Sequence, residues 1–225
     1  MKIYSIRRCI STRAALKADW DDFPWCRVEA LTLDHFLGDK PRHFPPTRIR
    51  LLYDAEGLCL HFHVADRYVR AAIQEHQGKV YQDSCVEFFF SPTGRGTEGY
   101  FNLEMNCGGF MLFRWRKAPG DEPVAINIHD IRRMDLVPSL PHHLPDEIQE
   151  PVTWRLVCHI PFAVLQNYSG FYPPRAGDIW RANFHKCADA CSYPHWLCWS
   201  PILSPKINFH QPHFFGKLIF GGALQ

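Results

Sequence analysis

Long apolar runs are missing from the sequence. No stretch approaches the roughly 20 apolar residues that a membrane-spanning helix needs, so we expect no membrane helix. The first 20 residues contain basic side chains but lack the apolar core of a secretory signal peptide. Both absences argue against a membrane or secreted protein and predict a cytoplasmic one.

A large excess of charge of one sign is missing too. Lys and Arg total 25 and Asp and Glu total 23, which gives a net charge of +2. A protein that binds nucleic acid through electrostatic contacts normally carries a clear basic excess, so we expect no nucleic-acid partner. We also find no internal repeat and no low-complexity tract. A chain of 225 residues with 46% hydrophobic residues is consistent with one soluble domain, 1–225.

Cysteines, in contrast, are abundant. Their number, nine, is odd, and they are scattered through the chain. They are Cys9, Cys26, Cys59, Cys85, Cys107, Cys158, Cys187, Cys191 and Cys198. Several lie inside apolar runs, where a thiol behaves as a small hydrophobic group. Without a signal peptide, we expect most of them to be reduced thiols of a cytoplasmic protein.

The pattern along the chain favours β structure. Aromatic residues make up 14% of the sequence and 18 residues are proline. Segments with alternating apolar and polar residues, bounded by Gly, Pro, Asp or Asn, are typical of strands. They cover residues 47–66 (with a turn at Asp54–Gly57), 83–92, 99–109, 109–115, 152–160, 178–186 and 214–220. Helical patterns are short and cover 160–168 and 11–20. We therefore predict an all-β, antiparallel, jelly-roll-like sandwich with one or two short helices.

The segment from Lys117 to Pro151 departs from this alternation. It contains six prolines and mixed charges. We predict a long excursion that carries one strand near Ala125–Leu136. Strand patterns resume on both sides of it, so it does not separate two domains.

Two predicted strands share an unusually polar face. In GYFNLEMNCGG, the residues Tyr100, Asn102, Glu104 and Asn106 alternate with apolar ones, and in DSCVEFFF Glu87 lies opposite the apolar face. If the strands form a hairpin across SPTGRGTEG that places Ser91 beside Tyr100, Glu87 lies beside Glu104. Cβ atoms of such a pair are about 4.5–5.5 Å apart. Two like charges this close need a proton, a cation or hydrogen-bond donors between them.

A third segment, DIWRANFHK, could supply donors, because Arg181, Asn183 and His185 share one of its faces. Carboxylates, amides and a guanidinium together suit a polyhydroxylated ligand, whose hydroxyls both donate and accept hydrogen bonds. The apolar face of a sugar ring packs on an aromatic ring, which Tyr81, Trp196 or Trp199 could supply. An ordinary solvated outer face of a sandwich also alternates polar residues, so no single residue of this set is diagnostic.

The stretch HWLCWSP holds two of these aromatic residues. Trp196 and Trp199 lie three residues apart, so they cannot share one face of an extended strand. We predict that Trp196 faces the ligand and that Trp199 packs in the core.

Several of these segments, in this order, resemble carbohydrate-binding modules of family 9, and more closely the stand-alone family 9-like proteins of bacteria. They are LLYDAEGLCLHFHVAD, VYQDSCVEFFFSP, GYFNLEMNCGG, WRANFHKC, HWLCWSP and NFHQPHFFGKLIF, within about Thr47–Phe220. The resemblance implies a β-sandwich related to DOMON domains that binds glucan ends or small sugars between two aromatic rings, without catalysis, as part of carbohydrate catabolism. In some members it also implies a structural calcium ion.

By position, the resemblance implies that Tyr81 is one sandwiching ring and that Trp196, or else Trp199, is the other. It implies a hydroxyl-binding role for Glu87, beside Glu104, and polar contacts from Asn106, Arg181 and Asn183. The family pattern has tryptophan where this chain has Tyr81.

Three other interpretations remain open. Related DOMON-like domains bind haem, for which Met105, Met111, His185 and Lys186 are the candidate axial ligands here. The segment HKCADACSYPHWLC brings Cys187, Cys191 and Cys198 close to His185 and His195, but its spacing is not that of a standard zinc site, and we assign it no metal. Glu87 and Glu104 could also be the two carboxyl groups of a glycoside hydrolase, which lie about 5–5.5 Å apart in retaining enzymes. We predict no catalytic residue.

Overall fold

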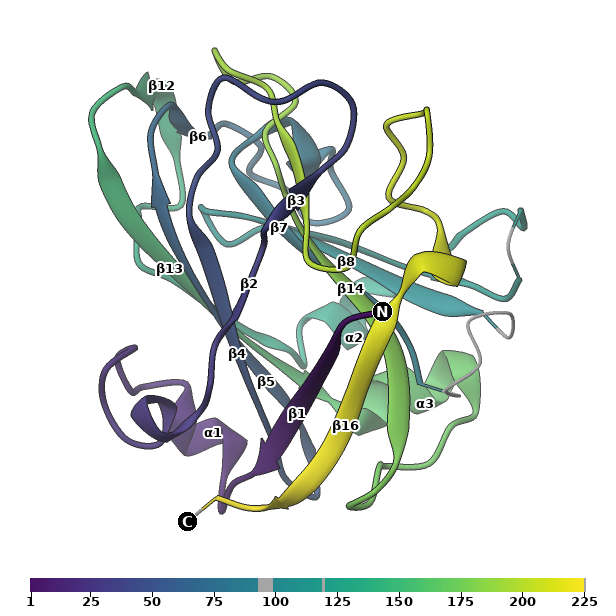
Figure 1. Cartoon of the computed structure of the whole chain (residues 1–225). Coiled ribbons are helices and arrows are strands. Elements are labelled where there is room, and N and C mark those ends of the chain that lie inside the picture. Colours follow the sequence, from purple (N-terminus) through teal and green to yellow (C-terminus); the bar gives the residue numbers. More distant parts are fainter. Residues whose placement is uncertain (93–98, 119, 225) are drawn as a thin grey trace.

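A computed structural model describes residues 1–92, 99–118 and 120–224 of the chain. Strands are the main regular structure of these residues, and fourteen strands form one continuous, strongly curled sheet. The main path through the sheet runs β10 (Val124–Ala125), β9 (Met111–Arg116), β8 (Tyr100–Asn106), β7 (Cys85–Ser91), β14 (Ile179–Cys187), β16 (Gly216–Ala223), β1 (Ile3–Arg8), β4 (Thr47–Tyr53), β5 (Gly57–Asp66), β13 (Val152–Pro161), β11 (Asp135–Pro138). Its two halves face each other like the layers of a sandwich (Figure 1).

Shorter strands extend the sheet at its margins. The strand β15 (Trp196–Cys198) pairs with β14 and with β3 (His35–Phe36), and β2 (Leu31–Thr32) pairs with β4. A separate pair joins β12 (Leu144–Ile148) to β6 (Val69–Ala71). Neighbours on the main path are antiparallel, except that β1 is parallel to both β16 and β4. The prediction of a mostly β fold is confirmed, whereas the jelly-roll and DOMON-like labels stay predictions.

Helices are short and few. The described ones are α1 (Thr12–Ala15), α2 (Ile128–Ile131) and α3 (Phe162–Ser169), with 3-10 turns at η1 (Trp25–Arg27), η2 (Val80–Gln82) and η3 (Pro212–Phe214). None of the described helices is long and apolar enough to cross a membrane. The helical pattern at 160–168 is confirmed by α3, but the one at 11–20 gives only the single turn α1.

The excursion at 117–151 contains more structure than one strand. The strand predicted near Ala125–Leu136 is wrong, because β10 ends at Ala125, α2 follows, and β11 begins only at Asp135. Asn127 ends the extended stretch by capping α2, since its side-chain oxygen accepts from the His129 N–H. The strand β12 completes the excursion by pairing with β6. Pro119, like residues 93–98 of the turn predicted across SPTGRGTEG, lies outside the described residues.

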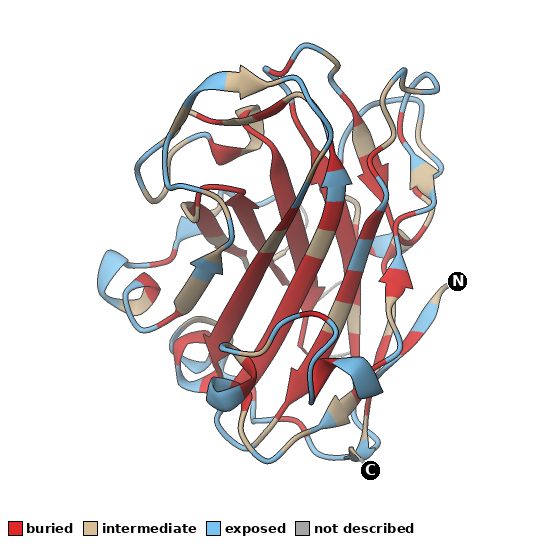
Figure 2. Ribbon diagram, turned by 90° about the vertical axis from the view of Figure 1, so that its left-hand side faces the viewer, coloured by how far each residue is buried: buried red, intermediate tan, exposed pale blue. Residues whose placement is uncertain are grey.

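The core lies between the two halves of the sheet. From one half, Phe88 and Phe184 stack with ring centroids 4.9 Å apart. From the other half, Phe62 and Trp154 pack into the same cluster, and both are fully buried. Burying a large apolar side chain stabilises the fold by about 1.5–3 kcal/mol. Figure 2 shows this burial along the strands, whereas exposed residues gather in the connections.

Strands β7 and β8 are buried on both faces, which the alternation does not predict. One face of each strand packs in the core between the halves. The other face is covered by connecting segments that form a second apolar cluster. Its members include Leu37, Val80, Phe89, Ile202, Phe209 and Phe215. The polar face that carries Glu87 and Glu104 is therefore enclosed rather than solvated.

A buried ion pair joins the two halves through the core. Lys186 of β14 is fully buried, and its Nζ lies 3.4 Å from Oδ2 of Asp66 on β5. Lys186 also donates to the Cys187 carbonyl and to Nε2 of His195 at 2.8 Å. Asp66 contacts Nε2 of His43 at 2.7 Å and accepts from the Trp154 indole N–H at 3.0 Å. These contacts satisfy both charges, as burial requires.

We expect Asp66 to make the protein labile to acid. Burial raises the pKa of Asp66, but Lys186, His43 and Trp154 outweigh burial, so the pKa lies well below its usual range. A depressed carboxyl pKa contributes stability above the unfolded value of about 3.9, and this stability is lost as pH falls toward the folded value. The replacement Asp66→Asn should therefore lower the free energy of unfolding at pH 7, with a smaller deficit at pH 3. Urea unfolding at both pH values measures this difference.

The matched control for this experiment is Asp39→Asn, at an exposed carboxylate. It should leave stability at both pH values within about 0.5 kcal/mol of the wild type. A deficit of Asp66→Asn that stays constant from pH 7 to pH 3 would contradict the assignment.

Candidate functional site

A cavity of about 500 Å³ opens on the enclosed polar face. Its floor comes from β7, β8 and β9, and its walls come from η2, the end of β14, β15 and the segment 207–210. Of the residues predicted to bind a ligand, Tyr81, Glu87, Glu104 and Trp196 line it. Small-molecule sites commonly enclose about 300–1,000 Å³, so the cavity has the size of a binding site.

The floor of the cavity is a row of paired side chains. Glu87 lies directly opposite Glu104 of β8 on one side and opposite His185 of β14 on the other, which confirms the predicted register. The Asn102 amide donates to Glu104 Oε1 at 3.1 Å. Nδ1 of His185 lies 3.2 Å from Glu87 Oε2, and the Cys187 thiol donates to Glu87 Oε1 at 3.2 Å.

Burial sets the protonation of this row. It raises the pKa of Glu87 to about 8, even though the Cys187 thiol lowers it. Burial and the charge of Glu87 raise the pKa of Glu104 well above its usual value. Burial also lowers the pKa of His185 far below its usual value, so the imidazole is neutral. Burial thus favours the protonated form of both carboxyl groups, and protonation of either one removes the like-charge contact.

The two half-buried aromatic residues of the cavity, Tyr81 and Trp196, are linked through one acidic residue. Trp196 donates its indole N–H to Asp189 Oδ1 at 2.8 Å, and the Asp189 N–H donates to the Tyr81 carbonyl at 3.1 Å. Asp189 thus joins β15 to η2 and sets the spacing of Tyr81 and Trp196. Both rings are half-buried and keep a surface toward the cavity.

Other predicted residues lie outside the cavity lining. Asn106 donates to Asp83 Oδ2 and the Ile73 carbonyl and accepts from the Phe110 N–H, so it fixes the start of β7 and the turn after β8. Asn183 bonds both the carbonyl and the N–H of Ser200. Because these amides already have backbone partners, they are not free to bind a ligand.

Arg181 and Trp199 are also outside the lining. Arg181 shares the face of His185, as predicted. It precedes His185 by four residues on β14, where it donates to the Phe215 carbonyl. Trp199 is 3% exposed and packs edge-on against Phe184 in the core. The predicted division of HWLCWSP, with one tryptophan at the surface of the site and one in the core, matches these positions.

The cavity contains polar side chains that we did not predict as ligand contacts. Arg114 and Arg116 of β9 line it with Asn102 of β8 and Asp189. Arg114 lies directly opposite Asn102, and Arg116 opposite Tyr100, so continuing the register onto β9 would have placed both. Asn208 and His210 reach the cavity from a connection without strand pairing, for which the sequence offers no register.

The candidate axial haem ligands do not lie around one common site. Met105 and Met111 are buried in the apolar core, and Lys186 is held in its ion pair on that same side of the sheet. His185 lies on the cavity side against Glu87 and stacks on Phe209 with centroids 4.0 Å apart. Nothing in this arrangement supports a haem site.

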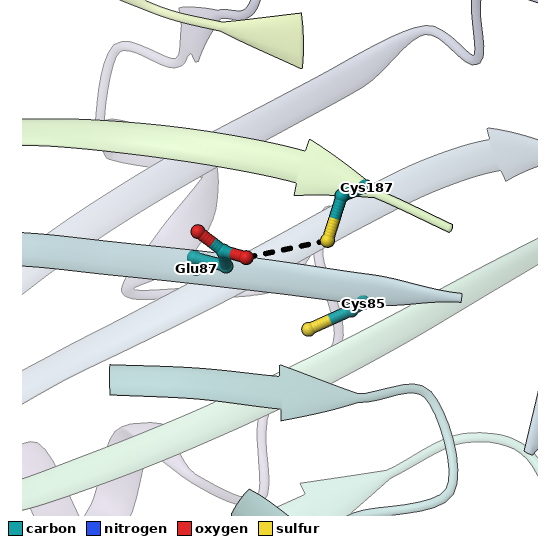
Figure 3. A group of neighbouring side chains, drawn as sticks. All are labelled: Cys85, Glu87 and Cys187. Carbon is teal, nitrogen blue, oxygen red and sulfur yellow. Dashed lines mark hydrogen bonds between the residues drawn. The ribbon is translucent and has the colours of Figure 1, made fainter. Parts of the chain in front are cut away.

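Metal-binding side chains gather in one place within the described ranges. The thiols of Cys85 and Cys187 and the carboxylate of Glu87 lie close enough to share an ion, and Figure 3 shows the Cys187 thiol directed at Glu87. Two thiols with one carboxylate do not fit calcium, which takes six to eight oxygen ligands. Cys191 and Cys198 of the sequence cluster are not part of this group, and all nine cysteines are free thiols.

Comparison with known proteins identifies the fold family. The profile of carbohydrate-binding family 9 matches residues 18–220, which is most of the chain. The chain belongs to carbohydrate-binding family 9. No match was found among curated proteins.

Solved structures of similar proteins agree with this family 9 assignment. A candidate carbohydrate-binding protein from Bacteroides uniformis is 29% identical, with a TM-score of 0.86 over 97% of this chain and 99% of that one. A family 9 module from Caldicellulosiruptor kristjanssonii in complex with glucose is 16% identical, with a TM-score of 0.63 over 98% of this chain and 96% of that one. The same module with cellotriose is 17% identical, again with a TM-score of 0.63, over 98% and 94%. The latter two share the fold of this family 9 protein.

Proposed function

We propose that this family 9 protein binds a small sugar or the end of a glucan in the cavity, without catalysing a reaction. The observation that carries the proposal is the cavity itself, which combines two half-buried aromatic rings with carboxyl, amide and guanidinium groups. Aromatic rings pack against the C–H face of a pyranose, and the polar groups match its hydroxyls. Family membership and the glucose and cellotriose complexes of related modules support this choice of ligand.

The proposed contacts follow from the geometry. Tyr81 and Trp196 would hold the two faces of the sugar ring, with Asp189 fixing the indole. Glu87 and Glu104 would bond hydroxyls at the floor, and burial favours their protonated form, in which a carboxyl group both donates and accepts. Arg114 and Asn102 would bond hydroxyls further along the floor.

Hydrolysis is the second candidate function, because Glu87 and Glu104 are directly paired. A retaining glycosidase needs one ionised carboxylate as nucleophile beside one protonated acid. Here burial raises the pKa of both groups, which favours two protonated acids rather than one of each form. This supports binding over cleavage. Turnover of aryl glycosides that Glu87→Gln abolishes would reverse the preference.

Calorimetric titration with glucose and cellotriose tests the proposed function. We expect saturable binding, and we expect Trp196→Ala to weaken it by about 30-fold, because the loss of an aromatic contact at the centre of a site costs about 2 kcal/mol. Tyr172→Ala, which removes an exposed ring outside the cavity, is the control and should bind as the wild type does. No binding of any mono- or oligosaccharide, or binding indifferent to Trp196→Ala, would refute the proposed site.

A further inference from the structure

Three potential metal ligands meet at one end of the cavity floor. Cys85 of β7 and Cys187 of β14 are directly opposite each other across the strand pair. Glu87 follows Cys85 by two residues, so its side chain projects from the same face of β7. The two sulfur atoms and a carboxylate oxygen all lie within 4.8 Å of one another, and Cys187 Sγ is 3.2 Å from Glu87 Oε1 (Figure 3).

These separations are near those of a zinc site. Zn–S bonds of about 2.3 Å and Zn–O bonds of about 2.0–2.2 Å in a tetrahedron place the ligand atoms roughly 3.5–3.8 Å apart. Side-chain rotation alone could bring the three atoms to such distances, because their backbones are already fixed by the β7–β14 ladder.

Unsatisfied buried atoms at this point give a second, independent indication. Glu87 is 3% exposed, and its Oε2 has no hydrogen-bond partner among the described residues. The same is true of both ring nitrogens of His185, although Nδ1 lies 3.2 Å from that oxygen. Buried polar atoms without partners are rare and costly, and an ion that the coordinates lack is one of their common explanations. An ion that displaces the proton of Glu87 would satisfy the carboxylate and leave His185 to orient it.

The three potential metal ligands can be reached from the cavity. Glu87 and Cys187 both line the cavity, whereas Cys85 lies behind them and is fully buried. An ion held by the three side chains would therefore have one coordination position directed at the cavity, which a water or a ligand oxygen could fill. Structural zinc sites have four protein ligands, whereas zinc sites with three protein ligands keep the fourth position for a water or a bound molecule.

We propose that Cys85, Glu87 and Cys187 bind one thiophilic divalent metal ion of the zinc class, at the floor of the cavity. Thiolate sulfur selects zinc and cadmium over calcium and magnesium, which prefer oxygen. The site shares Glu87 with the proposed sugar contacts, but metal binding is measured without sugar, so failure of one proposal is distinguishable from failure of the other.

Metal titration of the full chain tests this proposal. Protein stripped with a chelator and kept reduced by a non-thiol reductant is dialysed against Zn²⁺, and bound metal is measured by mass spectrometry. We expect one Zn²⁺ per chain, and with Cd²⁺ or Co²⁺ we expect the near-ultraviolet charge-transfer absorption of metal–thiolate bonds. Cys187→Ser should abolish the absorption and reduce zinc affinity at least 100-fold. Cys26→Ser, at an exposed thiol, is the matched control and should change neither.

A second variant keeps the test valid if the cysteine variant fails to fold. Glu87→Gln leaves both thiols in place and should weaken zinc binding about tenfold or more while retaining a thiolate absorption band. Less than 0.2 equivalents of bound zinc in fully reduced wild-type protein would overturn the proposal, as would unchanged affinity in both variants. A Cys85–Cys187 disulfide in metal-free protein that persists under the reductant, seen as two fewer thiols than nine, would overturn it as well.

Discussion

Replacing Lys186 with methionine is expected to lower the free energy of unfolding by about 3–5 kcal/mol, because the change leaves the buried charge of Asp66 without its cationic partner. His195 makes the effect larger. Burial, followed by the charge of Lys186, lowers the pKa of His195 to about 3, so its neutral Nε2 accepts from Lys186 while Nδ1 contacts the Tyr193 carbonyl. Methionine fills a similar volume but cannot donate. Urea unfolding measures the loss.

The double variant Lys186→Met/Asp66→Asn separates the charge from the packing. Removing both charges eliminates the unpaired carboxylate, so the double variant should be more stable than Lys186→Met alone. Lys217→Met, on the neighbouring strand β16, is the control and should cost less than about 0.5 kcal/mol because Lys217 is only half-buried. A free energy of unfolding of Lys186→Met within 1 kcal/mol of the wild-type value would mean that the Lys186–Asp66 pair does not stabilise the contact between the two halves of the sheet.

Titration of the buried carboxyl pair is expected to destabilise metal-free protein at alkaline pH. Burial raises the pKa of Glu87 to about 8, against about 4.3 in the unfolded chain. The folded state therefore holds a proton that the unfolded state has lost, and the stability that this contributes is fully present below about pH 4.3 and disappears as pH rises through about 8. Over that whole range the loss is on the order of 5 kcal/mol.

The variant Glu87→Gln isolates this contribution. Buried histidines such as His185 and His210, whose pKa values burial lowers, contribute an opposite slope below about pH 6.5. The difference between the wild type and Glu87→Gln removes that common background.

We expect the Glu87→Gln variant to gain stability relative to the wild type from pH 5 to pH 9, as measured by urea unfolding in the presence of a chelator. Glu75→Gln, at an exposed acid, should show no such trend. Parallel pH profiles for the wild type and Glu87→Gln would contradict the raised pKa.

The pairing of Glu87 with Glu104 could be predicted from the sequence. Strand alternation put both residues on one face, and the hairpin register placed them opposite each other, as the structure has them. This worked because side chains alternate strictly along a strand and antiparallel pairing follows simple arithmetic. The same reasoning predicted that Trp196 and Trp199 point in different directions.

Strand alternation did not predict the structure of the connections between strands. The strand expected near Ala125–Leu136 is instead interrupted by α2, because Asn127 can cap a helix as readily as it can end a strand. Asp189, which joins Trp196 to the Tyr81 segment, lies outside any alternating pattern. The role predicted for Asn106 as a ligand contact did not account for Asp83, whose carboxylate already accepts from its amide.

The sequence by itself determined the β-rich fold, the family and the polar face of β7 and β8, because these depend on local alternation and on the order of segments. Only the tertiary structure decided that this face is enclosed, since segments distant in sequence, such as those carrying Leu37 and Phe209, cover it. The same burial raised the pKa values of Glu87 and Glu104, and the pairing of β7 with β14 brought Cys85 to Cys187. Desolvation and thiol proximity depend on packing between strands, which no local pattern encodes.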